Sequence, residues 1–464
     1  MIDVDVLIVG AGPTGLTASI ALSRHSVRSL TVERHPGTTI FPRAIGINTR
    51  SMEIFRSFGL DTIVKQASFE VILNVTRTRT LMDPDPVLSP PLGTPETDLS
   101  PVAWTTCSQF ELEPILLREA SSHPEAELCF NTQLVSLQQS EDAVRAVIED
   151  RSTGRRSEVR CRYVIAADGA KSPLRQRFGI ALEGPGELGH NVNIHFNAPL
   201  AERIPHRPIF FHRVQNEHVE GVFFTTDGAS RWILLVGYKP RSGESPEDFT
   251  DERAVQLIRQ GSGMPDLEID ITAKKQWTTQ ADMATRWVEG RVFLAGDAAH
   301  RMTPLGALGM NTGIQDAHNL AWKMAAVLQG WAGTELLDTY EAERRPVAQA
   351  NVNRSVELLG TGLLDVARPI PPVPSSGRTA LDFDIGFEYA STAVIPDGRF
   401  DVPTGDSAAV PSSRPGCRAP HVWISHNGNR VSTLDLLGPY FTLLVDEGDT
   451  VWSRAARAVG TTTQ

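Results

Sequence analysis

The chain has 464 residues, of which 41% are hydrophobic and 21% charged, so its composition is that of a globular protein with two or three domains. Its formal net charge of −11 argues against nucleic acid or an anionic membrane as a partner. The four cysteines are scattered, a spacing that favours neither a zinc site nor a disulfide framework. With no signal-peptide pattern and no long apolar segment, the sequence predicts a cytoplasmic protein without a bound metal.

The N-terminal part of the chain has the pattern of a strand, a helix and a second strand. These segments are residues 4–9, 14–23 and 29–33. Gly10, Gly12 and Gly15 follow the first strand, where glycines allow a tight turn, close approach of a pyrophosphate and close packing of helix and strand. Glu33 ends the second strand, where a carboxylate can accept hydrogen bonds from ribose hydroxyls. These four residues predict a dinucleotide site at the start of the helix.

Two strand-rich regions occupy the middle of the chain. Residues 128–167 alternate in hydrophobicity and end in a strand that is followed directly by Asp168. By itself this position is equally typical of a strand-to-helix turn in which the carboxylate caps the helix. Residues 188–239 contain further strands, which predict an antiparallel sheet inserted into the nucleotide-binding part.

The inserted sheet offers candidates for substrate contacts. Its aromatic side chains, Phe224 and Trp232 among them, suit a flat, largely apolar ligand. His212 and Tyr238 are the candidates for catalytic groups, although the same residue types pack sheets more often than they react. Trp277 is expected just outside the sheet.

A late segment carries the second half of the cofactor pattern. Asp297 follows a predicted strand at residues 291–295, where its carboxylate can accept from a ribityl or ribose hydroxyl. Gly306, Gly309 and Gly313 leave backbone amides uncovered near a helix start, which suits the negative charge of a reduced flavin ring. Together with the glycine-rich turn, this segment predicts a flavin dinucleotide.

Beyond this segment the sequence predicts two helices, over residues 312–328 and 336–359. Residues 367–380 are rich in proline and serine and are predicted to form a linker. The tail from residue 416 contains short strand candidates and too few residues for a complete domain of its own.

The order of these motifs resembles that of the single-component FAD-dependent aromatic hydroxylases, which share the para-hydroxybenzoate hydroxylase fold. Further matches narrow the resemblance to the branch of phenol and aromatic polyketide hydroxylases. They lie at residues 41–48, 52–56, 108–113 and 315–323. The resemblance covers residues 1 to about 360, and residues 415–423 and 432–438 resemble the opening of the thioredoxin-like third domain of this branch.

The resemblance implies an α/β fold with α+β inserts. A Rossmann-like FAD-binding domain would be discontinuous, over residues 1–180 and 280–365. An antiparallel-sheet substrate domain would span residues 181–279, with parts of residues 70–105. The remaining expected parts are a linker and packing segment at 366–413 and a partial thioredoxin-like segment at 414–464.

The resemblance also implies cofactor roles for individual residues. The residues expected to hold the ADP half of FAD are Gly10, Gly12, Gly15 and Glu33. Those expected to approach the pyrophosphate or the flavin from other segments are Arg43, Gln109, Arg118 and Asp168, the last also handling NAD(P)H. Those expected along the ribityl chain and the flavin ring are Gly296, Asp297, Pro304 and the amides of Gly309, Met310 and Asn311.

The function implied by the resemblance is that of an FAD-dependent monooxygenase. It would use NAD(P)H and dioxygen to hydroxylate a phenolic or polycyclic polyketide-type aromatic in secondary metabolism, through a C4a-hydroperoxyflavin. Because the sequence has a single GxGxxG strand unit, NAD(P)H would bind transiently and not in a domain of its own. A homodimer is one expected assembly.

Other functions remain open at this point. The same scaffold supports epoxidation or Baeyer–Villiger insertion, since the sequence does not fix which carbon is presented to the oxygen. A halogenase or a reductase is a second class, and the Trp-x-Trp-x-Ile-Pro element of halogenases is missing. A non-catalytic FAD-binding remnant is a third reading, supported only by the short C-terminal region.

Overall fold

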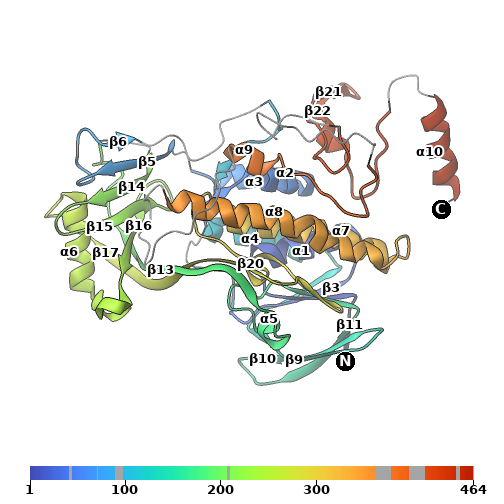
Figure 1. The fold of residues 1–464 in the computed structure, drawn as a ribbon, viewed down its shortest axis with the longest axis horizontal. Helices are drawn as coiled ribbons and strands as arrows, with labels where there is room; N and C mark the ends of the chain where they lie inside the picture. The colour runs from blue at the N-terminus through green and yellow to red at the C-terminus, as the bar shows by residue number, and fades with distance from the viewer. Residues whose placement is uncertain are drawn as a thin grey trace.

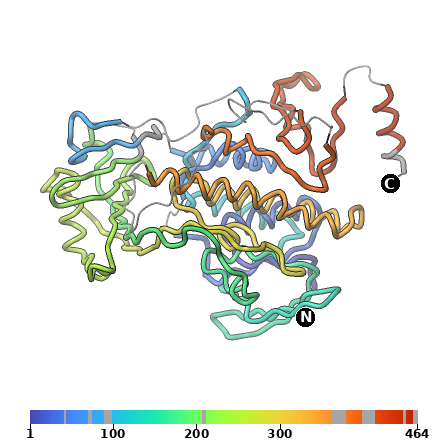
Figure 2. Tube along the Cα trace, viewed as in Figure 1, coloured from blue at the N-terminus to red at the C-terminus, as the bar shows by residue number. Residues whose placement is uncertain are grey.

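The computed structural model describes residues 1–40, 44–69, 72–88, 98–205, 209–360, 378–396, 413–445 and 450–462. Within these residues two large sheets dominate, and the long helix α8 (Glu335–Leu359) crosses the middle of the molecule between them (Figure 1). Helix α10 (Thr450–Thr462) stands away from the rest at the C-terminal end, as the tube also shows (Figure 2). No helix in the described part of the chain has the length and apolar composition needed to cross a membrane.

The first large sheet has six strands, of which all but β18 run parallel. Their order across the sheet is β18 (Val288–Glu289), β19 (Val292–Leu294), β12 (Tyr163–Ala166), β2 (Val6–Val9), β3 (Ser29–Val32) and β8 (Ala126–Cys129). The central strands are short and apolar throughout, as expected for a parallel sheet that is covered on both faces. The two neighbours of β12 are β2 and β19, which lie far apart in the sequence.

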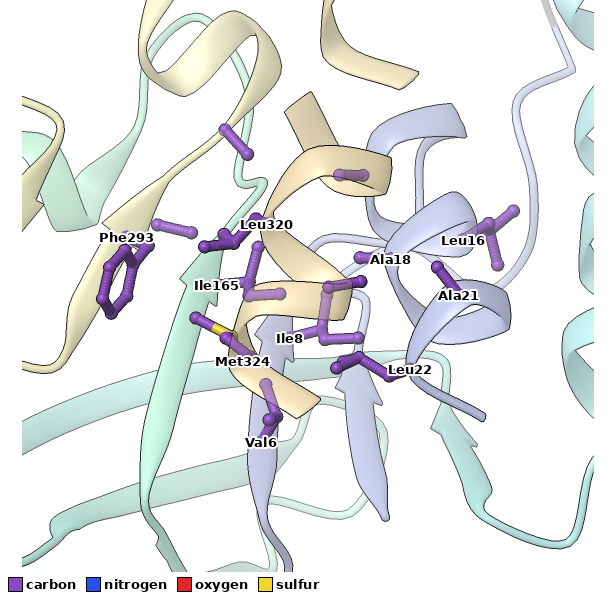
Figure 3. Packing of buried hydrophobic residues seen from close by; sticks show 14 of the residues in the cluster. Val6, Ile8, Leu16, Ala18, Ala21, Leu22, Ile165, Phe293, Leu320 and Met324 are labelled. Atoms are coloured by element: carbon purple, nitrogen blue, oxygen red, sulfur yellow. The ribbon is translucent and has the colours of Figure 1, made fainter. Parts of the chain in front are cut away.

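Helices α1 (Pro13–Arg24) and α7 (Leu308–Leu328) cover the same face of this sheet. Figure 3 shows their apolar side chains meeting those of β2, β12 and β19. The side chains in this contact include Val6, Ile8, Ala18, Leu22, Ile165, Phe293, Leu320 and Met324, all of them buried. The small side chain of Ala18, which points to α7, lets the two helices approach closely.

The second large sheet has eight strands and is antiparallel except where β14 pairs with β5. Their order is β20 (His300–Arg301), β17 (Asp270–Ala284), β13 (Leu182–Asn197), β16 (Arg231–Tyr238), β15 (Glu220–Thr225), β14 (Ile209–Gln215), β5 (Ile72–Thr78) and β6 (Val87–Leu88). At one end of the molecule this sheet lies between α6 (Asp251–Ser262) and α8 (Figure 1).

The two faces of the eight-stranded sheet bury different side chains. The α6 face is the one whose core includes Ile194, Phe223, Trp232 and Leu234 of the sheet together with Ala254 and Ile258 of α6. The α8 face is the one whose core includes Leu188, Val222, Leu235 and Ala281 of the sheet together with Val352 and Val356 of α8. Because successive side chains of a strand alternate between faces, neighbours in the sequence belong to different cores.

Smaller elements complete the described fold. The smaller sheets are β1 (Ile2–Asp3) with β11 (Arg156–Cys161), β10 (Val144–Asp150) and β9 (Thr132–Gln139), then β4 (Gly46–Ile47) with β7 (Thr105–Thr106), and β21 (Trp423–His426) with β22 (Asn429–Ser432). The other helices are α2 (Thr49–Phe58), α3 (Asp61–Gln66), α4 (Gln109–Ser122), α5 (Pro173–Arg177) and α9 (Ala380–Asp384).

The predicted α/β fold, with a Rossmann-like part and an inserted sheet, is confirmed. The thioredoxin-like nature of the C-terminal segment and the exact domain boundaries stay predictions. Two details were wrong. Trp277 lies inside β17 and not outside the sheet, paired with Asn191 of β13. Helix α7 begins at Leu308, four residues before the predicted start, because Ala307 adopts a left-handed conformation that initiates it.

Candidate functional site

Three turns meet at the carboxyl edge of the six-stranded sheet. They follow β2, β12 and β19 and contain Gly10, Asp168 and Gly296, respectively. A Cβ atom on Gly10 would collide with the carbonyl oxygen of Ala167, so the first two turns touch. In open α/β sheets, ligands bind outside the carboxyl ends of parallel strands. The structure therefore brings these three sequence-distant motifs to one place, at the edge where a dinucleotide is expected.

The glycine-rich turn leaves the start of α1 accessible. Gly10 has a φ of +105°, which L side chains rarely adopt. A Cβ on Gly15 would collide with the Gly10 carbonyl, whereas a Cβ on Gly12 would meet nothing within 4 Å. Gly12, the N-cap residue of α1, has no side chain that could cap the helix. The positive end of the helix is thus open at Gly12, which suits a pyrophosphate.

Glu33 is fixed beside this turn. Its Oε2 accepts from the backbone N–H of Ala11 at 2.9 Å, and its Oε1 accepts from the backbone N–H of His35 at 2.9 Å. The carboxylate therefore joins the end of β3 to the glycine-rich turn. This is the position from which an acidic residue contacts a ribose in dinucleotide-binding folds.

The two carboxylate oxygens of Asp168 differ in their hydrogen bonding. Its Oδ2 accepts from the backbone N–H of Leu174 at 3.0 Å. Its Oδ1 is buried and has no hydrogen-bond partner among the residues that the structure describes. Burial raises the pKa of this carboxyl, partly offset by its hydrogen bonds to Ser172 and Leu174. A buried acceptor without a protein partner is expected to meet a ligand or a water molecule.

Asp297 is the exposed residue in an otherwise buried run. The residues on both sides of it, 292–296 and 298–300, are buried. The turn is tight, because a Cβ on Gly296 or on Gly313 of α7 would press against the side chain of Thr14. An exposed carboxylate at a buried junction of three segments can accept from ligand hydroxyls, as predicted for the ribityl chain.

Asp316 of α7 holds the turn that carries Asp297. Its Oδ2 accepts from the backbone N–H of Gly296 at 3.1 Å and contacts Nε2 of His300 at 2.7 Å. Its Oδ1 accepts from Nε of Arg344 at 2.8 Å. Asp316, His300 and Arg344 are all fully buried. Burial raises the pKa of Asp316, but the contacts with His300 and Arg344 outweigh it and leave the pKa below its ordinary value.

The N-terminus of α7 is open as well. Ala307, the N-cap residue, has a φ of +53° and a methyl side chain that cannot cap the helix. The first residues of a helix, here Leu308, Gly309 and Met310, have amides without an intrahelical acceptor. These amides and the helix dipole suit the negative charge that a reduced flavin ring carries. Pro304 is exposed in the turn just before them.

Asn311 fixes this turn with its side chain. It is buried, and its Oδ1 accepts from the backbone N–H of Asn48 at 3.0 Å. Its Nδ2 donates to the carbonyls of Gly46 at 2.9 Å and of Ala307 at 2.6 Å. Asn311 therefore joins β4 to the turn before α7, and the cofactor role predicted for its amide stays a prediction.

The remaining cofactor candidates lie on two other segments. Gln109 begins α4, and its Nε2 donates to Oε1 of Glu113 at 2.6 Å, while Oε2 of Glu113 accepts from the backbone N–H of Thr39 at 2.6 Å. Arg118 is exposed nine residues further along α4, about 13 Å from Gln109 along the helix axis. Its peripheral role stays a prediction. Arg43 lies outside the described residues.

His212 and Tyr238 lie on the α6 face of the eight-stranded sheet. Nδ1 of His212 is 2.9 Å from Oγ1 of Thr76, and its ring is buried beside Trp232 of the α6-face core. Tyr238 packs against the same core, with its ring near Phe249. The structure does not bring either residue together with the cofactor turns. This placement argues for a packing role in both cases.

The aromatic side chains of the α8 face lie near the cofactor turns instead. Phe211, Phe224 and Trp277 are partly buried against a core that contains Leu305, the residue after Pro304. The rings of Phe211 and Phe224 are 5.5 Å apart. The α8 face thus continues into the turn that leads to α7.

Asp316 and Arg344 were missed in the sequence, as was Phe211 of the α8 face, whereas Phe224 and Trp277 were among its aromatic candidates. Asp316 lies inside a motif that resembles the family, so the sequence marked its position. The sequence did not indicate which residues Asp316 contacts. Arg344 is 28 residues further along and has no local pattern of its own. Only the packing of α7 on α8 reveals the pair.

A family model described as an FAD binding domain matches residues 3–355. The chain belongs to this FAD-binding family. It is an FAD-dependent monooxygenase of the aromatic hydroxylase type, as the named relatives and solved structures show. The family model and a similar solved structure with FAD confirm the cofactor predicted from the sequence. The open helix start at Gly12, the buried Oδ1 of Asp168 and the exposed Asp297 fit it.

Two relatives and one solved structure illustrate the similarity. Tetracenomycin A2 monooxygenase-dioxygenase of Streptomyces glaucescens is 38% identical over 484 aligned residues, covering 98% of this chain and 84% of that protein. Aklavinone 12-hydroxylase DnrF of Streptomyces peucetius is 38% identical over 459 aligned residues, covering 97% of this chain and 93% of that protein. The crystal structure of aklavinone-11 hydroxylase with FAD and aklavinone has a TM-score of 0.89 and 35% identity, covering 100% of this chain and 87% of that one.

Proposed function

We propose that this FAD-dependent monooxygenase hydroxylates a polycyclic, phenolic substrate of the polyketide type, with NAD(P)H and dioxygen as cosubstrates. The observation that carries the proposal is the aromatic α8 face, which continues into the turn before α7. A flat substrate laid on this face would lie next to the flavin ring. Relatives named for tetracenomycin A2 and aklavinone support a fused-ring substrate.

Each group of residues has a separate task in this proposal. The glycine-rich turn, Glu33 and Asp297 bind and orient FAD, and the first amides of α7 stabilise negative charge on its ring. Bound FAD supplies the activation of dioxygen after reduction by NAD(P)H. Phe211, Phe224 and Trp277 stack on the substrate and exclude water from the reacting atoms.

The experiment is a turnover assay of the purified FAD-loaded protein. Naphthols, anthraquinones and larger fused-ring phenols are offered with NADH or NADPH under ¹⁸O₂, and the products are analysed by mass spectrometry. We expect a fused-ring phenol to accelerate NAD(P)H oxidation and to gain one labelled hydroxyl. A labelled epoxide or ester would instead indicate epoxidation or Baeyer–Villiger insertion, and no labelled product from any arene would overturn the proposal.

Asp297→Ala tests the cofactor assignment independently of the substrate. Because hydrogen bonds to a charged group contribute about 1.5–3 kcal/mol, we expect FAD binding to weaken by roughly ten- to a hundredfold. The dissociation constant is measured by titrating the apoprotein with FAD and following flavin fluorescence. Asp266→Ala, an exposed carboxylate before β17, is the matched control and should bind FAD like the wild type. Equal loss in both variants would contradict the role of Asp297.

A further inference from the structure

The family model ends at residue 355, but the described chain returns to the cofactor site after it. We propose that residues 378–396 form a brace that positions both flavin-binding turns, through Tyr389 on one path and Asp384 on another. The two turns are the one at Gly296 and the one at Ala307. The proposal depends on FAD binding, which the family shows, and not on the identity of the substrate.

The first path runs from Tyr389 to the Gly296 turn. NH1 of Arg344 donates to the Tyr389 hydroxyl at 3.1 Å, and Nε of Arg344 donates to Asp316. Asp316 in turn accepts from the backbone N–H of Gly296. The guanidinium also lies 5.7 Å from the centre of the Phe387 ring, a cation–π contact. Phe387 and Tyr389 thus both contact the guanidinium that holds Asp316.

The second path runs from Asp384 to the Ala307 turn. Asp384 is buried, and its oxygens accept from Nδ2 of Asn48 at 3.1 Å and from the backbone N–H of Thr49 at 3.3 Å. The backbone N–H of Asn48 donates to Oδ1 of Asn311, whose Nδ2 donates to the Ala307 carbonyl. The first two steps join different segments and the last joins Asn311 to Ala307 just before α7, so a shift of α9 is passed on to the turn before α7.

The brace is itself well ordered by local contacts. Helix α9 begins with a capping box, in which the backbone N–H of Thr379 donates to Asp382 at 2.6 Å and the backbone N–H of Asp382 donates to Thr379 at 3.3 Å. Arg378 lies over the ring of Phe383 at 4.6 Å. Burial raises the pKa of Asp384 to about 7, and the hydrogen bonds from Thr49 and Asn48 oppose this shift. A segment with its own fixed shape can transmit position, which a linker cannot.

The test compares Tyr389→Phe, Asp384→Asn and the double variant with the wild type. Tyr389→Phe removes only the hydroxyl that Arg344 donates to, and Asp384→Asn places an amide group against a donor. Glu388→Gln is the matched control, because Glu388 is exposed and pairs with Arg414 at 3.1 Å on the outer side of the same segment. The FAD dissociation constant, the visible spectrum of the bound flavin and the melting temperature of the apoprotein are measured for each.

We expect each single change to weaken FAD binding by about three- to tenfold and to shift the flavin absorption bands. The double variant should weaken FAD binding more than either single change, and the two effects need not multiply, since Gln315 accepts from Arg344 at 3.4 Å and donates to Asn48 at 3.5 Å and so links the two paths. The control should stay within about twofold of the wild type.

Wild-type FAD affinity and spectrum in both single variants would overturn the proposal. So would a lower melting temperature of the apoprotein with unchanged FAD affinity and spectrum, because that pattern shows a merely structural contact. If Asp384→Asn yields no folded protein, Thr379→Ala tests the same path by loosening the capping box of α9. None of these measurements uses a substrate or NAD(P)H, so their failure is distinct from failure of the hydroxylation assay.

Discussion

Phe223 and Phe224 are neighbours on β15, yet they belong to different parts of the molecule. Phe223 is fully buried in the α6-face core, where its ring presses so closely on Gly261 of α6 that a Cβ there would collide with it. Phe224 is partly buried on the α8 face, beside Phe211 and the turn that leads to the cofactor site. One face therefore holds the sheet together and the other meets the ligands. Adjacent residues of one strand thus have different roles, because one side chain stabilises the fold and the next lies on the ligand-binding face.

Phe223→Ala should have the largest effect. Removing a fully buried phenylalanine from a close-packed core costs about 3–5 kcal/mol in the free energy of unfolding. Urea unfolding of the apoprotein measures the change. Phe224→Ala serves as the matched control and should cost clearly less, because its ring is only partly buried. Similar losses in both variants would show that the two faces are not as different as the structure indicates.

Ile194 belongs to the α6-face core, so strand alternation places the next residue, His195, on the opposite face of the sheet. Titration of His195 makes the free energy of unfolding depend on pH. Burial, reinforced by Lys275, lowers the pKa of His195 to about 4. The unfolded chain binds a proton at this site between about pH 6.5 and 4, where the folded chain does not, so stability falls as the pH drops through this window. The loss is about 2 kcal/mol after allowance for residual solvent screening.

His195→Asn should flatten the dependence of unfolding free energy on pH between 6.5 and 4. The measurement is a series of urea melts over that range, with His218→Asn, an exposed histidine, as the control. If His195→Asn keeps the wild-type slope, another group must be responsible for it.

Phe224→Ala tests whether the α8 face contacts the substrate. It removes an aromatic surface from the α8 face, so we expect kcat/KM for the fused-ring substrate to fall about tenfold, equivalent to about 1.4 kcal/mol. The FAD dissociation constant should not change, since Phe224 belongs to none of the cofactor turns. The yield of hydroxylated product per NAD(P)H oxidised is measured alongside kcat/KM. An unchanged kcat/KM with wild-type coupling would remove Phe224 from the substrate site.

Tyr238→Phe should have the smallest effect. Its ring packs on the α6 face, and burial, together with Glu247 and Glu187, raises the pKa of its hydroxyl. Both FAD affinity and kcat should stay within about twofold of the wild type. A large fall in kcat with FAD binding intact would place chemistry on the α6 face and break the division between the two faces.

Local patterns in the sequence predicted much of the cofactor site. The glycines after β2, Asp168 after β12 and Asp297 after β19 each stand directly behind a short apolar strand, and parallel strands bring their carboxyl ends to one edge. The α/β fold and the inserted sheet followed from the same signals. These inferences needed only the order of strands and turns along the chain.

The face on which a side chain lies was not predictable in the same way. His212 and Tyr238 were chosen by residue type, and only the register of β14 and β16 on either side of β15 shows that they point to α6. The contact of Arg344 with Asp316 depends on how two long helices pack, and Tyr389 reaches Arg344 from beyond a predicted linker. Such contacts carry no local periodicity, so a single sequence gives no signal for them.

The placement of β19 beside β12 has a consequence for how the chain folds during synthesis. The N-terminal strand β2 and helix α1 cannot be fully covered until β19 and α7 exist, because these elements complete the sheet and its packed face (Figure 3). Strands β14, β15 and β16 pair with one another in sequence order, whereas β13 pairs with the later β16 and β17. We therefore expect the β14–β16 part of the substrate sheet to fold first on the ribosome. The N-terminal unit would stay protease-sensitive until residue 328 has emerged, which limited proteolysis of stalled chains can measure.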